Sequence, residues 1–189
     1  MNVDAYKKKF LEKYNPEKSI EIALVNSVKA AVQHNALYTK NTSIQIRKEI
    51  RSFWFECLKE IGGKFQKDVQ LNEYEVMIAN LKEKMNKKFG EHFNSGSPHG
   101  SEFRISHAQK SISIYVKYLW CMNLIEEPRI CPVDRIILSK TDAYLSKDVS
   151  WGFVNNLSVH KRKFKYILDS AAVANLTVAK WELLLFSKT

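Results

Sequence analysis

Hydrophobic positions recur every three or four residues over long stretches of this chain, which is the spacing of one face of an α-helix. In residues 3–14, for example, Val3, Tyr6, Phe10 and Leu11 fall on one side of a helix. Six Gly and four Pro are few turn formers for 189 residues. The pattern therefore predicts an all-α protein of about eight helices. We expect one compact domain over residues 1–189, with room for two small lobes.

Start and stop signals set the expected bounds of these helices. Pro16 suits the first turn of the second helix, Asn41 or Thr42 suits the cap of the third, and Gly62-Gly63 is expected to stop it. The loop-like stretch 94–102 is the expected lobe boundary, and a short helix fits within 141–157. The predicted helices cover residues 3–14, 16–37, 41–61, 71–89, 106–123, 132–140, 158–172 and 175–187.

Charge narrows the expected partners. The chain carries 30 Lys and Arg against 20 Asp and Glu, a net charge of +10, which favours DNA, RNA or an anionic membrane. A basic protein without such a partner is the alternative. No apolar run approaches the ~20 residues of a membrane span, and the start of the chain does not resemble a signal peptide. We therefore expect a cytoplasmic protein with no membrane partner.

Residues that bind metals are sparse. Cys57, Cys121 and Cys131 are odd in number and form no CxxC pair, which argues against a disulfide framework, a zinc ribbon and a four-cysteine iron–sulfur cluster. Buried packing is the expected role of all three. The aspartates show no ligand spacing, so we expect no metal and no cofactor.

A lysine stands near the predicted start of one helix. Ser106-His-Ala-Gln109 has the form of a capping box, which places Lys110 in the first or second turn. Lys117 follows two turns later, on the side opposite the apolar face. A lysine amine can serve as a covalent nucleophile. The alternative is that both lysines are solvated surface residues.

An aspartate stands near the predicted start of the next helix. Pro132 suits the first helical position, so Asp134 falls within the first turn. One interpretation is structural, because an acidic side chain there complements the helix dipole. The other is chemical, because a fixed carboxylate stabilises a developing sugar cation.

The ordered pair Lys110-Ser-Ile with Lys117, then Pro132-Val133-Asp134, resembles the core of the helix-hairpin-helix DNA glycosylases. The likeness is closest to the 8-oxoguanine branch, in particular the archaeal GO glycosylases, and covers roughly residues 103–140. It implies a helix-hairpin-helix-like core and excision of a damaged or modified base from double-stranded DNA. One nucleotide is flipped into a pocket, and Asp134 stabilises the cationic sugar. Lys110 attacks C1′ as a Schiff-base nucleophile and permits AP-lyase activity, or water attacks instead.

This chain departs from that family at the hairpin. The glycines that bring the family's backbone amides to a DNA phosphate are missing from Phe103-Arg-Ile-Ser-His-Ala-Gln109. Side chains of Arg104 or His107 are the expected substitutes.

Further DNA contacts are expected from Lys117 and from the densest basic cluster, at residues 160–165. A flipped base needs an aromatic or apolar slot. In the resembling family, side chains from early and late helices form it. The phosphate-contact candidates in the basic cluster are Lys161, Arg162, Lys163 and Lys165, and the base-pocket candidates are Gln33, Trp54 and Trp181.

The main alternative function is a non-catalytic, basic helical module that binds DNA. It explains the charge but not the ordered lysine and aspartate. A helical-bundle RNase is disfavoured because the nearest Arg and His, Arg104 and His107, stand too close together. We expect a monomer. The excised base, and a role in repair or in defence, stay open.

Overall fold

The computed structural model describes residues 2–32, 37–94 and 102–186. Within these ranges the chain is helical, with no β-strand and one isolated bridge between Tyr38 and Phe93, so the all-α prediction is confirmed. The elements are α1 Val3–Tyr14, α2 Ile20–Ala31, α3 Ile44–Lys64, α4 Leu71–Phe89, the 3-10 helix η1 Gly90–His92, α5 Ile105–Cys121, α6 Arg135–Leu138, α7 Leu157–Val173 and α8 Val178–Phe186.

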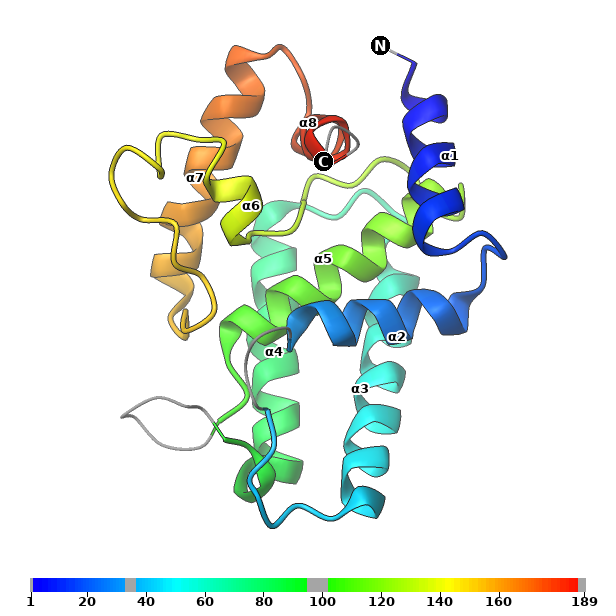
Figure 1. The fold of residues 1–189 in the computed structure, drawn as a ribbon, viewed down its shortest axis with the longest axis vertical. Coiled ribbons are helices and arrows are strands. Elements are labelled where there is room, and N and C mark those ends of the chain that lie inside the picture. Colours follow the sequence, from blue (N-terminus) through cyan, green and yellow to red (C-terminus); the bar gives the residue numbers. More distant parts are fainter. Residues whose placement is uncertain (1, 33–36, 95–101, 187–189) are drawn as a thin grey trace.

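Helix α5 is the centre of the molecule (Figure 1). It packs against α1, α2, α3, α4 and α7, and every one of its residues except Ile114 is buried. A helix that is covered on all sides must satisfy its polar side chains internally. The buried polar residues of α5 are therefore candidates for a structural or chemical role.

Helices α3 and α4 form a long hairpin beside α5 (Figure 1). Gly62 does not stop α3, which continues to Lys64. A Cβ at Gly62 would lie 2.7 Å from Tyr115 Cε1 and 2.9 Å from Leu119 Cδ1. This glycine therefore permits a close approach of α3 to α5 instead of ending the helix.

Buried apolar side chains form two clusters. The larger surrounds α5 and includes residues from α1 to α5 and from α8. The smaller joins residues 131–143 to α7 and α8, with Leu138, Ile167 and Ala143 almost completely buried. Asp134 lies in the chain segment of the smaller cluster, whereas Lys110 lies on α5 within the larger one.

Several predicted helix bounds were wrong. Helix α2 begins at Ile20, where Ser19 caps it, and not at Pro16. Helix α6 is a single turn, much shorter than the predicted 132–140, and residues 141–156 form turns without a helix. The predicted loop beyond Asn94 lies outside the described residues up to Ser101.

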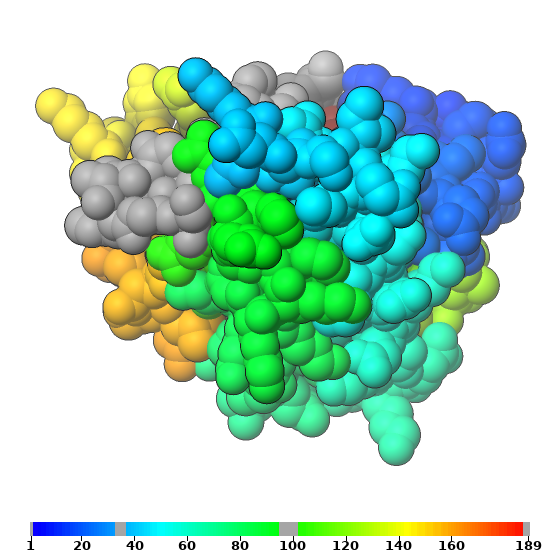
Figure 2. Space-filling model, turned by 90° about the horizontal axis from the view of Figure 1, so that it is seen from below, coloured from blue at the N-terminus to red at the C-terminus, as the bar shows by residue number. Residues whose placement is uncertain are grey.

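From below, α3 (cyan) and the end of α4 (green) lie between the N-terminal helices on one side and α7 on the other (Figure 2).

Among the described residues, no helix is both long enough and apolar enough to cross a membrane.

Candidate active site

Lys110 and Asp134 meet although 24 positions separate them in the chain. The distance from Lys110 Nζ to Asp134 Oδ2 is 3.2 Å, and the two side chains are 6% and 16% exposed. The indole ring of Trp151 lies against the same amine, with its centroid 4.2 Å from Nζ. An amine, a carboxylate and an aromatic ring thus converge at the junction between the two apolar clusters.

The position of Asp134 is fixed from both sides. Its Oδ1 accepts a hydrogen bond from Ile137 N at 3.0 Å, so Asp134 is the N-cap of α6 and not, as predicted, a residue of its first turn. Directly before it, Gln109 Nε2 donates to Val133 O at 2.8 Å and Val133 N donates to Gln109 Oε1 at 3.2 Å. The neighbour of Lys110 on α5 therefore holds the neighbour of Asp134.

Helix α5 begins differently from the predicted capping box. Ile105 is its first residue, and Arg104 N donates to His107 Nδ1 at 3.0 Å. Ser106 lies inside the helix, where its hydroxyl donates to Gly152 O at 2.8 Å. Lys110 consequently falls in the second turn.

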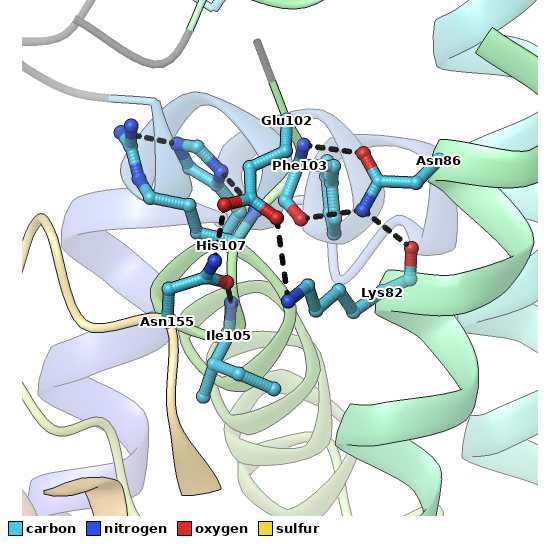
Figure 3. A network of polar contacts seen from close by, with 8 residues as sticks. Lys82, Asn86, Glu102, Phe103, Ile105, His107 and Asn155 are labelled. Carbon is cyan, nitrogen blue, oxygen red and sulfur yellow. Dashed lines mark hydrogen bonds and ion pairs between the residues drawn. The ribbon is translucent and has the colours of Figure 1, made fainter. Parts of the chain in front are cut away.

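A network of polar contacts surrounds the N-terminus of α5 (Figure 3). Asn86 Nδ2 donates to Phe103 O and Phe103 N donates to Asn86 Oδ1, both at 2.7 Å. Asn155 Nδ2 donates a hydrogen bond to Glu102 Oε1, and Ile105 N donates to Asn155 Oδ1 at 3.3 Å. Glu102 also forms an ion pair with Lys82 at 3.3 Å. These backbone amides are engaged by protein groups.

Arg104 and His107 are therefore not surface phosphate contacts. Both are buried, and Arg104 Nη2 lies 3.3 Å from His107 Nε2. Burial, and to a lesser degree the Arg104 charge, lowers the pKa of His107 to about 3. The expectation that they replace the missing glycines is wrong, because both side chains lie in the interior and contact each other.

Lys117 is also an interior residue rather than a DNA contact. Its Nζ lies 2.8 Å from Glu182 Oε2 of α8, and the rings of Phe10 and Phe186 cover it at 4.5 and 4.1 Å. Burial raises the pKa of Glu182, and the Lys117 charge opposes that shift. This second pair is the more enclosed of the two, since Glu182 is 4% exposed against 16% for Asp134.

The basic cluster of α7 is balanced by acids. Lys163 is buried and pairs with Asp148, which corrects its prediction as a phosphate contact. Lys161 and Arg162 are exposed but pair with Glu75 and Asp148 at 2.6 and 3.2 Å. Lys165 pairs with Asp169 at 2.9 Å. Phosphate binding by the three exposed cations stays a prediction.

The predicted base-pocket tryptophans pack in the interior. Trp54 is 0% exposed and donates from Nε1 to Ser111 Oγ at 3.1 Å, and Trp181 is 7% exposed in the smaller cluster. Gln33 lies outside the described residues. Trp151, which the sequence interpretation passed over, is half-buried against Lys110. One signal was available, because Trp151 is the one tryptophan of four outside the eight ranges predicted as main helices.

Other chemistry is limited in the part of the chain that the structure describes. No group of three or more His, Cys, Asp or Glu side chains there could hold a metal ion. The three cysteines are buried, as predicted, and burial raises the pKa of Cys121 to about 12. These thiols are packing groups.

Comparison with protein-family models, with curated proteins and with solved structures finds no match to this chain.

Proposed function

We propose that this protein is a DNA glycosylase in which Asp134 and Lys110 act on the deoxyribose of a flipped nucleotide. The single observation that carries the proposal is the contact of 3.2 Å between Lys110 Nζ and Asp134 Oδ2 beneath the Trp151 ring. The pair of Lys117 with Glu182 of α8 is more enclosed, because its carboxylate is 4% exposed against 16% for Asp134 and two phenylalanine rings cover its amine. The partial exposure of Asp134 and Trp151 gives the first pair a route to solvent.

Each group has a defined task in this reaction. As the C1′–N bond breaks, positive charge develops on the sugar, and the carboxylate of Asp134 stabilises it. Lys110 gives its extra proton through Asp134 Oδ2 to the departing base, so that Asp134 is again a carboxylate when the charge on the sugar has developed. The amine then forms a bond to C1′. Opening of the sugar ring then transfers the C1′–O4′ electrons and one proton of the bound nitrogen to O4′. It leaves a protonated imine, the Schiff base that permits strand cleavage.

Trp151 is the wall of the base slot in this proposal. A base attached to C1′ lies within a few ångströms of any amine that attacks that carbon. The indole that already contacts Nζ is therefore placed to stack on it. Trp151→Phe should preserve most base release, whereas Trp151→Ala should reduce it about tenfold or more, as expected for loss of a stacking partner worth ~1–3 kcal/mol.

The decisive experiment needs no knowledge of the excised base. A duplex with one abasic site, made by removing uracil enzymatically, exposes the C1′ aldehyde that a lysine can attack. Borohydride reduces the resulting imine to a stable amine, which appears as a covalent protein–DNA complex. Wild type should form the complex, and Lys110→Ala should not.

A matched control removes the other buried lysine of α5. Lys117→Met combined with Glu182→Leu deletes that pair without leaving a lone charge and should still form the complex. A panel of duplexes with oxidised, alkylated or mismatched bases then identifies the substrate by base release, which Asp134→Asn should abolish. Salt-sensitive binding of duplex DNA with neither trapping nor base release would contradict the proposal and indicate a non-catalytic binding module.

A further inference from the structure

Residues 151–154 form a tight turn that covers the amine of Lys110. Val154 N donates to Trp151 O at 3.0 Å, which closes the turn, and the centroid of the Trp151 ring lies 4.2 Å from Lys110 Nζ. The Lys110 side chain is only 6% exposed. A deoxyribose does not fit against an amine this enclosed unless one of the groups around Nζ moves.

Two of the groups at this site are held by the core. Asp134 Oδ1 accepts from Ile137 N at 3.0 Å, and the preceding Val133 exchanges two hydrogen bonds with Gln109. Val133 and Ile137 are each 2% exposed. Lys110 itself belongs to α5, whose residues are nearly all buried. Displacing either partner of the ion pair would therefore disrupt the packing of the core.

The turn is the least enclosed part of the site. None of residues 150–156 is fully buried, and Phe153 is 53% exposed. Trp151 packs against the edge of the smaller apolar cluster and Val154 against the edge of the larger one. Segments with few buried contacts open locally at a lower free energy than the core. The turn is therefore the part of the site that opens most readily.

Ser106 attaches this turn to the first turn of α5. Its hydroxyl donates to Gly152 O at 2.8 Å, and its backbone N donates to Val154 O at 2.9 Å. Ile105 N donates to Asn155 Oδ1 at 3.3 Å, as Figure 3 shows. The first N–H groups of a helix have no partner within it, so the segment after Trp151 satisfies them from outside. Of these donors, the Ser106 hydroxyl is the one that a substitution removes.

We propose that residues 151–154 are a gate over Lys110 and that Ser106 is the positioning residue that latches it. In the closed state the Trp151 ring shields the amine from solutes. When the hydrogen bonds to Ser106 break, the turn moves away from α5 and the amine becomes accessible to a sugar. The biological role of the gate rests on the proposed function, but its opening is measured on the amine itself, without DNA.

Reductive alkylation with glyceraldehyde and cyanoborohydride measures access to each lysine, and peptide mass spectrometry follows the modified fraction over time. Lys110 and Lys117 are both 6% exposed on the same helix, but phenylalanine rings of α1 and α8 cover Lys117. Ser106→Ala should raise the rate at Lys110 about fivefold, as expected for loss of one hydrogen bond, and should leave the rate at Lys117 unchanged.

Ser113→Ala is the matched control for this substitution. It also removes a buried hydroxyl of α5, but one that bonds to Gln109 O within the helix. It should change the rate at neither lysine. Equal gains at Lys110 and Lys117 in Ser106→Ala would indicate general loosening of the fold. That result, or no gain at Lys110, would overturn the inference.

A second variant tests whether Ser106 acts through the Trp151 ring. Trp151→Ala removes the cover but keeps the latch, so it should also raise the rate at Lys110 and not at Lys117. Adding Ser106→Ala should then give little further gain, because release of a turn without the ring uncovers nothing. A full second gain would show that Ser106 acts through α5 itself and would refute the gate.

Labelling and the reaction with DNA distinguish this inference from the proposed function. If Ser106→Ala exposes Lys110 but wild type neither traps an abasic duplex nor releases a base, the gate stands and the glycosylase proposal fails. If wild type traps the duplex while Ser106→Ala leaves the labelling of Lys110 unchanged, the chemistry stands and the gate fails.

Discussion

At the scale of single residues, α5 buries two lysines seven positions apart and gives each the same two kinds of neighbour. Lys110 has Asp134 and the Trp151 ring, and Lys117 has Glu182 and two phenylalanine rings. A buried cation is tolerated only when an opposite charge or π-electrons replace water around it. What separates the two pairs is the carboxylate, because Asp134 is 16% exposed whereas Glu182 is 4% exposed.

The Lys117–Glu182 pair should matter for folding alone. Glu182→Gln leaves the Lys117 ammonium without its carboxylate in the interior and should lower the free energy of unfolding by about 3–5 kcal/mol. The double replacement Lys117→Met with Glu182→Leu should recover most of that loss. Urea unfolding measures both. Lys165→Ala, which removes an exposed pair with Asp169, is the control and should have little effect. A single substitution no worse than this control would contradict the burial.

Two buried histidines should make the protein sensitive to acid. Burial lowers the pKa of His107 to about 3 and of His160 to about 4, with Arg104 and Lys161 as lesser causes. In the unfolded chain both imidazoles take up a proton near pH 6.5. The unfolded state therefore binds more protons below that pH. The stability from both neutral rings is present above about pH 6.5 and is lost as pH falls toward 4 and then 3.

Urea midpoints measured between pH 7.5 and 4.5 test this expectation. The midpoint should fall steadily below pH 6.5. His160→Phe should make the decline shallower, because His160 packs with Tyr74 and Phe164 and a phenyl ring fits among them without titrating. A wild-type midpoint that stays constant over this range would refute the assignment of buried, neutral rings.

At the scale of elements, neighbouring glycines in α3 should respond in opposite ways. Gly62→Ala places a Cβ 2.7 Å from Tyr115 and should destabilise the fold by about 1–3 kcal/mol, because α3 and α5 must move apart. Gly63→Ala meets nothing within 4 Å and should stabilise α3 by up to about 1 kcal/mol. Thermal melts of the two variants form a matched comparison. Equal shifts would argue against close packing at Gly62.

The link between α5 and α6 should affect the site without contacting it. Gln109 exchanges two hydrogen bonds with Val133, the residue before Asp134. Gln109→Leu leaves two backbone groups unsatisfied and should cost about 1–3 kcal/mol each in unfolding free energy. It should also slow trapping on an abasic duplex. The rate should fall even at temperatures at which the variant is still folded, so loss of stability alone would not explain it. Ser113→Ala, which removes a bond within α5, should leave the trapping rate unchanged.

The elements that the sequence predicted well are those with a strong apolar stripe and clear ends. Helices α1 and α4 have the bounds that the periodicity predicted, and they end at Tyr14 and Phe89. Helix α6 was overestimated because Asp134 caps it from outside. The start of α5 was misjudged because His107, a residue rarely considered as a cap partner, accepts from Arg104 N.

The candidate site was predictable only in part. The sequence order of Lys110 and Asp134 was sufficient to suggest their pairing. Trp151 was missed, because its place over the amine depends on how residues 139–150 fold back on α7. The burial of Lys117 was missed for a related reason. Its partner Glu182 is 65 positions away, and no local pattern reports a contact at that range.

At the scale of the whole molecule, net charge does not show where the proposed DNA partner would bind. The chain carries +10, yet the densest basic cluster, on α7, faces acids of its own fold. A cation already paired with a carboxylate releases fewer counterions when it approaches a phosphate. The exposed cations between Asp134 and Trp151 lie closer to the candidate site along the chain. We therefore expect the proposed DNA partner to contact the exposed cations Arg135, Lys140 and Lys147 rather than the most basic helix.

Salt dependence of duplex binding distinguishes these two surfaces. Replacing Arg135, Lys140 and Lys147 together by Gln should reduce the slope of log K against log salt by about 2–3, since each phosphate contact contributes roughly 0.9. The same change at Lys161, Arg162 and Lys165 also removes three charges, so it controls for net charge. We expect it to alter the slope by less than about 1, because each cation is paired within the protein. Fluorescence anisotropy with an undamaged duplex measures both slopes. The reverse ranking would place the DNA on α7 and contradict this expectation.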